Sequence, residues 1–200
     1  MRSVSPDPAH LRRLALLLAF PETEAIAVLW ELATQEPWLG EAIAELESLS
    51  LDHWQAEYTR LFLVGYPQTP CPPYESAYRE GSMHGQAVHS LQDLYRRIGL
   101  EAQSMPADYL GTQLECAAYL ADRGRAYSAG TEAPAGGKGL TTWPTSTADP
   151  LALATELWEE HLCRWLPRFA ADLQVQTQLL LYRQLGAQLA QLCAGCSHAD

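Results

Sequence analysis

The apolar residues of this chain recur at intervals of three and four, the spacing that places side chains on one face of an α-helix. Leu11, Leu14 and Leu18 show the spacing near the start, and it returns between residues 84 and 98 and between residues 175 and 194. No run of alternating apolar and polar residues is long enough to predict a strand. We therefore predict an all-α fold of about eight to ten helices, in a single domain that spans residues 1–200.

Composition narrows the classes of partner. Apolar residues make up 48% of the 200 residues, which is typical of a folded globular protein. The formal charge of -11 disfavours nucleic acid and acidic membrane surfaces and favours a cationic partner. No apolar run approaches the roughly 20 residues that span a bilayer, so no stable membrane insertion is expected. The apolar block at 14–20 lacks a following cleavage site, which predicts a first helix and a cytoplasmic protein.

Glycine and proline predict where several helices end. Gly65 is expected to end one helix in the left-handed conformation, and Gly99 and Gly124 to end two others. Residues 125–149 are rich in Gly, Pro, Ser and Thr and predict a flexible connector. Its length permits a swapped arrangement, so both a monomer and a domain-swapped homodimer stay open.

The five cysteines, at 71, 116, 163, 193 and 196, are odd in number and scattered, which favours reduced thiols over a disulfide framework. Cys193 and Cys196 form a C-x-x-C pair that supplies two zinc ligands at most. We interpret the pair as two incidental thiols, with metal or redox chemistry as the alternative. The six histidines show no metal-binding spacing on one helix face, so no metal site is predicted.

Enzyme signatures are also lacking, because the sequence contains no nucleotide-binding glycine motif, no nucleophile elbow and no zinc-protease motif. Asp108 and Glu115 are two helical turns apart and share a face if their helix begins by 108. Alone, such a pair of carboxylates is usually solvated or caps a helix. No catalytic residue and no cofactor is predicted.

The stretch from Glu57 to Tyr78 indicates a recognition surface. It holds five aromatic residues within 21 positions, namely Tyr58, Phe62, Tyr66, Tyr74 and Tyr78. Pro70, Pro72 and Pro73 stiffen the loop in its middle. Aromatic rings beside carboxylates predict an apolar groove with an acidic rim, suited to an extended or helical peptide with apolar and basic residues. For Tyr58 and Phe62, a place in the hydrophobic core is an equal alternative.

The ordered motifs Y58-T-R-L-F62, P72-P-Y-E-S-A-Y78 and P106-A-D-Y-L-G-T-Q-L-E115 resemble the TorD/DmsD/NarJ family of molybdoenzyme maturation chaperones, also called redox enzyme maturation proteins. Similar motifs continue to the C-terminal helices, so the resemblance spans nearly the whole chain. Two positions depart from the usual family pattern, because Tyr109 replaces a histidine and Cys116 a phenylalanine.

The resemblance implies a TorD-like helical chaperone and not an enzyme. Such a chaperone binds the N-terminal leader, in many members a twin-arginine signal peptide, of an apo molybdenum oxidoreductase catalytic subunit. It holds the leader for cofactor insertion before export or assembly. The peptide-binding residues that we predict are Tyr58, Leu61, Phe62, Pro73, Tyr74, Glu75, Ser76, Tyr78, Asp108, Tyr109 and Glu115. The alternative is a small-molecule-binding enzyme or sensor whose pocket is lined by the same aromatics.

Overall fold

The structure is a computed structural model that describes residues 6–82, 85–103, 105–129 and 149–196. These residues form helices α1 to α10 with short π and 3-10 turns and contain no strand, so the predicted all-α fold is confirmed. The chain divides into two compact units, and each is described by itself. The single domain stays a prediction, and most of the predicted connector lies outside the described residues.

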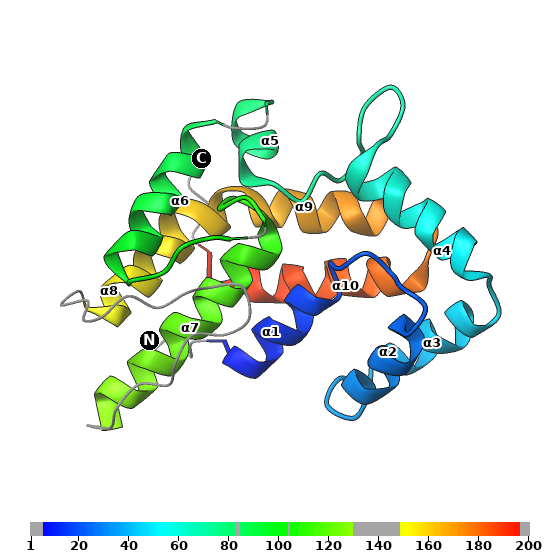
Figure 1. Ribbon diagram of the computed structural model, residues 1–200, viewed down its shortest axis with the longest axis horizontal. Helices are drawn as coiled ribbons and strands as arrows, with labels where there is room; N and C mark the ends of the chain where they lie inside the picture. Colours follow the sequence, from blue (N-terminus) through cyan, green and yellow to red (C-terminus); the bar gives the residue numbers. More distant parts are fainter. Residues whose placement is uncertain (1–5, 83–84, 104, 130–148, 197–200) are drawn as a thin grey trace. The chain divides into compact units, whose positions relative to one another are not determined.

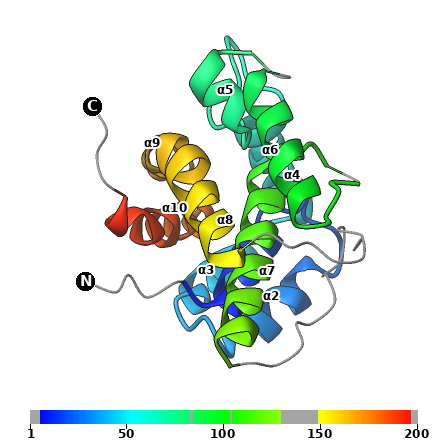
Figure 2. The same ribbon diagram turned by 90° about the vertical axis from the view of Figure 1, so that its left-hand side faces the viewer.

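Unit 1 comprises residues 1–16, 74–165 and 195–200. Its long helix α7 (Leu110–Ala129) packs against α1 (Pro8–Leu16) and α8 (Pro150–Glu156), and α5 (Glu75–Glu80) packs against α6 (Gln86–Arg97) (Figures 1 and 2). The apolar spacing of α1 is explained by this packing, because Leu11 and Leu14 are fully buried. A π turn at Leu157–Leu162 joins α8 to the start of α9 (Cys163–Gln176).

Unit 2 comprises residues 17–73 and 166–194. In this unit α3 (Leu39–Glu47) packs against α2 (Ala25–Ala33) and α10 (Leu180–Leu192) (Figure 1). Helix α4 (Leu51–Tyr58) continues into a π turn at Thr59–Leu63. Its Trp54 indole donates a hydrogen bond of 2.8 Å to the Tyr182 hydroxyl of α10. Buried aromatic rings with satisfied polar ends therefore connect segments of this unit that are distant in sequence.

Two predicted helix ends differ in outcome. Gly99 follows α6, so the predicted helix end there is confirmed, and its φ of 72° is left-handed. The end predicted at Gly124 is wrong, because α7 continues to Ala129. A Cβ at position 124 would lie 2.9 Å from Leu151 Cδ2, so close approach of α8 explains the glycine.

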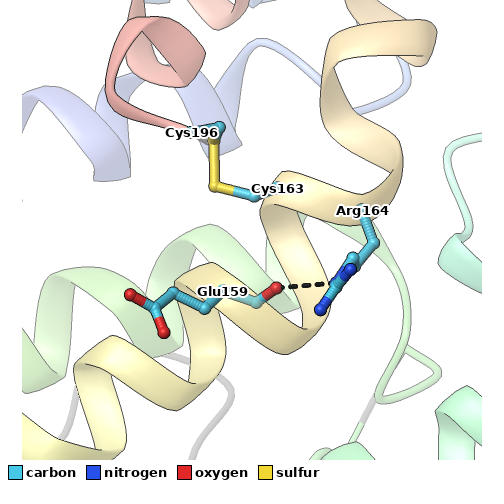
Figure 3. The surroundings of a disulfide bond; sticks show 4 residues. All are labelled: Glu159, Cys163, Arg164 and Cys196. Carbon is cyan, nitrogen blue, oxygen red and sulfur yellow. Dashed lines mark hydrogen bonds between the residues drawn. A yellow bond between two sulfur atoms is a disulfide. The ribbon is translucent and has the colours of Figure 1, made fainter. Parts of the chain in front are cut away.

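The prediction of five reduced thiols is wrong for two of them. Cys163 and Cys196 form a disulfide, with Cα atoms 5.4 Å apart (Figure 3). The partner of Cys196 is therefore not Cys193 but a residue 33 positions earlier, at the start of α9. At the same helix end the Arg164 Nε donates to the Glu159 carbonyl oxygen at 2.9 Å (Figure 3). Cys193 is a free thiol whose pKa burial raises to about 11.

Two further properties of the described residues concern membranes and metals. None of the helices there is long and apolar enough to cross a bilayer. Among the same residues no group of three His, Cys, Asp or Glu side chains is placed to hold a metal ion.

Candidate peptide-binding segment

The first part of the predicted segment lies in unit 2 and is mainly core. Tyr58, Leu61 and Phe62 are 6%, 0% and 2% exposed. The Tyr58 and Phe62 rings meet edge to face at 4.9 Å, and Phe62 meets Tyr182 in the same way at 5.1 Å. The Tyr58 hydroxyl donates to the Leu18 carbonyl oxygen at 2.9 Å. These contacts favour the core alternative, and peptide contact by these residues stays a prediction.

An exposed apolar loop follows directly. Leu63 and Val64 are 49% and 75% exposed, and Tyr66 is fully exposed. The base of the loop is closed by a hydrogen bond of 2.9 Å from the Cys71 amide to the Leu61 carbonyl oxygen. Residues 63–67, which include the exposed Leu63, Val64 and Tyr66, are called the apolar loop. Leu63 and Val64 are not among the residues predicted from the sequence to bind peptide. The signal was the unbroken run L61-F-L-V64, of which a helix end can bury only one side.

Gly65 is needed in this loop for a reason other than the predicted one. Gly81 and Gly99 are the glycines with positive φ among the described residues, so the left-handed conformation expected at Gly65 is wrong. A Cβ at position 65 would lie 2.6 Å from both the Gln68 carbonyl oxygen and Pro70 Cδ. Glycine is therefore required by the close approach of the returning chain.

Pro73, the last residue of the 17–73 segment of unit 2, is buried, and the chain returns to unit 1 at Tyr74. Tyr74 pairs with Tyr109 in an isolated antiparallel bridge, and their rings are 5.6 Å apart. Burial and the nearby Asp108 carboxylate raise the pKa of the Tyr74 hydroxyl. The backbone bridge brings two predicted motifs, 72–78 and 106–115, side by side.

Asp108 holds the start of α5. Its Oδ2 accepts hydrogen bonds from the Ser76 hydroxyl at 2.6 Å and from the Ser76 amide at 3.2 Å. The amide is one of those at a helix start that have no partner within the helix. Asp108 is 2% exposed and precedes α7, so the helix face that it was expected to share with Glu115 does not form.

Glu75 is the centre of a buried polar cluster. Its carboxylate lies 3.0 Å from His161 Nδ1, accepts from Gln113 Nε2 at 3.1 Å, and pairs with Arg79. We assign the Nδ1 proton to the bond with the carboxylate, so that Nε2 accepts from the Ser90 hydroxyl at 3.3 Å. Glu75 has no exposed surface and Ser76 has none. In this structure, neither forms part of an acidic rim.

Two further predicted residues lie elsewhere in unit 1. The Tyr78 ring stacks at a tilt on Trp165, with centroids 5.5 Å apart. Glu115 projects from α7 toward Arg12 of α1, with Oε2 and Nε 3.8 Å apart. Burial raises the pKa of the Glu115 carboxyl, and the Arg12 charge partly opposes the rise. Peptide contact by these two residues stays a prediction.

The fold of this chain has a counterpart among solved structures. Its structure is similar to the crystal structure of a protein from Archaeoglobus fulgidus that is assigned to the redox enzyme maturation proteins. The two share 22% sequence identity with a TM-score of 0.61, and the match covers 96% of each chain. At this identity the likeness is one of fold.

Sequence comparison with protein families is more specific. The family model described as nitrate reductase delta subunit matches residues 29–171, more than two thirds of the chain. The chain therefore belongs to this family of NarJ- and TorD-type chaperones, and the resemblance found from its motifs is confirmed. Among curated proteins, no sequence matches the chain. Members of the family serve molybdoenzyme maturation as chaperones and are not enzymes.

Proposed function

We propose that this chain binds the N-terminal leader of an apo molybdenum oxidoreductase catalytic subunit and holds it until the cofactor is inserted. The leader that fits is a twin-arginine signal peptide, with a basic region followed by an apolar region. The proposed setting is the cytoplasm, before export or assembly of the client. The observation that carries the proposal is the apolar loop, which exposes Leu63, Val64 and Tyr66. The loop lies within residues 29–171, the part of the chain that the family model matches.

The loop suits an apolar peptide because its shape is held by the protein. Gly65 packs against Pro70, and the Cys71 amide ties the returning chain to Leu61. A preformed loop loses little conformational freedom on binding, which favours affinity. Exposed apolar side chains on such a loop contribute through the area that a bound peptide removes from water.

The charge of the chain suits the basic part of a leader. A net charge of -11 attracts a cationic peptide over several ångströms and accelerates encounter at low salt. Within unit 1, the backbone bridge to Tyr109 holds the backbone of Tyr74, a second residue predicted to contact the peptide. The small-molecule alternative gains no support, since the rings of Tyr58, Phe62 and Tyr182 contact one another.

Isothermal titration with a synthetic leader from a molybdoenzyme encoded beside this chain tests the proposal. We expect saturable binding that weakens when both arginines of the leader are replaced by glutamine. The loop variant Tyr66→Ser should also bind more weakly, whereas Val175→Ser, an exposed position on α9, should bind as the parent does. No binding of the leader at low salt, with an apo catalytic subunit also failing to bind, would refute the function.

The number of chains in the chaperone is a separate question. We propose a monomer or a domain-swapped homodimer, the two states that the predicted connector allows. Size-exclusion chromatography with light scattering distinguishes them, because the two differ twofold in mass.

A further inference from the structure

Ser90 is the outer member of a hydrogen-bonded series that runs from the surface of unit 1 into its buried polar cluster. The residue lies inside α6 and is exposed. Its hydroxyl is 3.3 Å from His161 Nε2, and His161 Nδ1 is 3.0 Å from the Glu75 carboxylate. His161 and Glu75 are 3% and 0% exposed. These three residues, Ser90, His161 and Glu75, are called the Ser90 triad.

The position of Ser90 on α6 explains how one side chain reaches both solvent and a buried ring. Ala87 and Leu94 are buried and belong to the face of α6 that packs within unit 1. Ser90 lies three residues after Ala87 and four before Leu94, which places it at the edge of that face. His161 comes from the π turn at Leu157–Leu162, which contacts α6. The fold itself therefore brings the ring to the serine.

The direction of the hydrogen bonds follows from the charges around Glu75. Its carboxylate pairs with Arg79 and accepts from Gln113 Nε2 at 3.1 Å, so it acts as an acceptor. His161 Nδ1 then carries the proton between the ring and the carboxylate, and Nε2 presents its lone pair to the Ser90 hydroxyl. An imidazole fixed in this way can take the hydroxyl proton while the oxygen attacks an electrophile. The Ser90 triad thus has the hydrogen-bond pattern of an activated serine nucleophile.

The backbone around Ser90 limits what such a nucleophile can do. Ser90 is the fifth residue of α6, so its amide and those after it bond to carbonyl oxygens one turn earlier. These amides cannot stabilise an oxyanion, and hydrolysis of an acyl-serine needs that stabilisation for a second time. We expect the reaction to stop once the serine is acylated, in agreement with a family of chaperones that are not enzymes.

We propose that Ser90 is a site of covalent acylation, with His161 as its general base and Glu75 as the residue that positions the ring. The donor is an activated ester or thioester. A bond forms between Ser90 Oγ and the acyl carbon, and the bond from that carbon to the leaving oxygen or sulfur breaks. The hydroxyl proton passes to His161 Nε2 and then to the leaving group, so no oxidant or reductant is needed. The product is one acyl ester per chain.

A fluorophosphonate reporter probe tests the nucleophile, because it forms a phosphorus–oxygen bond to an activated serine and releases fluoride. Intact-mass spectrometry should show one adduct per chain, and peptide mapping should place it at Ser90. Ser48 is the internal control, because it is also exposed and its hydroxyl donates to the Glu45 carbonyl oxygen at 2.6 Å. We expect Ser90 to be labelled about 100-fold faster than Ser48. Equal labelling of the two serines, or none at Ser90, would overturn the proposal.

Variants then separate activation from mere exposure. Ser90→Ala should lose the adduct. His161→Asn keeps an amide donor for Glu75 but has no base toward Ser90, so labelling should slow about 100-fold. Glu75→Gln can pair with either ring tautomer and should slow labelling about tenfold. A parental labelling rate in either of these variants, measured on protein shown by circular dichroism to be folded, would contradict the assigned role.

A measurement on the parent protein needs no substitution in the core. Labelling of Ser90 should fall to the rate of Ser48 when urea unfolds the chain, because unfolding separates the serine from His161. Persistent fast labelling in urea would show that the fold does not activate Ser90 and would overturn the proposal.

An acyl donor tests the extent of the reaction. With p-nitrophenyl acetate, the parent should release one equivalent of p-nitrophenolate per chain in a burst that Ser90→Ala lacks. Continued release that Ser90→Ala abolishes would show turnover and refute a reaction that stops at the acyl-serine. Neither assay contains a leader or a client, so a failure here leaves the proposed function untouched.

Discussion

Residues 58–66 and 74–78 are neighbours in the sequence with similar aromatic content, yet they differ in what the structure does with them. The first stretch buries Tyr58 and Phe62 in an apolar core and then exposes Val64 and Tyr66. The second buries the charged Glu75 completely and surrounds it with hydrogen-bond donors. Residue type alone therefore does not decide exposure in these two stretches, because apolar side chains are exposed in one and a charged side chain is buried in the other. Glu75 can be buried because it has hydrogen-bond partners, and a buried carboxylate is stable only when it is paired.

The strongest test of this comparison is Glu75→Ala. Removing the carboxylate takes one hydrogen-bond partner from the buried Gln113 amide and one from the His161 ring, and it removes the ion pair with Arg79, so we expect a loss of about 3 kcal/mol in the free energy of unfolding. Urea unfolding measures the loss, with Glu101→Ala, an exposed site in the same unit, as the control. A weakened leader affinity with unchanged unfolding would instead place Glu75 at the peptide.

Gly65→Ala tests the bracing of the apolar loop. The added methyl group meets backbone and proline atoms at 2.6 Å, which forces the loop to shift at a cost of about 2 kcal/mol. Gly40→Ala is the matched control, because its Cβ meets nothing within 4 Å and it lies inside α3. That control should gain about 0.5–1 kcal/mol in unfolding free energy. If both variants unfold alike, close packing does not explain Gly65.

Glu57, one residue before the first stretch, is a buried carboxylate in unit 2, and its substitution tests whether hydrogen bonds stabilise it there as they do Glu75 in unit 1. Burial acts to raise its pKa, but hydrogen bonds from Arg60, the Gln178 amide and Thr177 outweigh burial and lower the pKa. Glu57→Gln should cost about 1–2 kcal/mol at pH 7. Because the pKa of Glu57 is lower in the folded protein, its carboxylate stabilises the fold at pH values above the unfolded pKa of about 4.3. The cost of Glu57→Gln should therefore shrink as pH falls through the folded-state pKa, where the carboxylate becomes protonated. A pH-independent cost measured by thermal unfolding would contradict this account.

The smallest effect on stability is expected at the apolar loop itself. Val64→Ser and Tyr66→Ser should each change the free energy of unfolding by less than about 0.5 kcal/mol, because both side chains face water. The same variants should weaken leader binding, measured by titration. A variant that lost stability and affinity together would show that the loop is structural.

The fold was predictable where short-range pattern decides structure. The spacing of Leu11, Leu14 and Leu18 gave buried faces, and Gly99 ended its helix as expected, because both depend on residues a few positions away. Features that depend on contacts between residues distant in sequence could not be predicted from such local patterns. The burial of Glu75 depends on His161, 86 positions later, and Gly124 is explained by Leu151 in another helix.

The candidate site also combines features that local sequence predicts with features that depend on distant residues. The stiff, proline-rich loop was predicted from local chemistry, whereas the exposure of Leu63 and Val64 depends on how the π turn at the end of α4 is packed. Asp108 was predicted as a peptide-binding residue, and that role stays a prediction. Its bond to Ser76, 32 positions away, could not be read from spacing along one helix.

The disulfide between Cys163 and Cys196 closes the intervening chain into a covalent ring that contains the whole of α9 and of α10. A single backbone cut near the exposed Gln178, between these helices, would therefore leave both fragments attached. The nicked chain should migrate near full length on a denaturing gel and separate into two pieces only after a reductant is added. Limited proteolysis thus reports the redox state of this pair without any label.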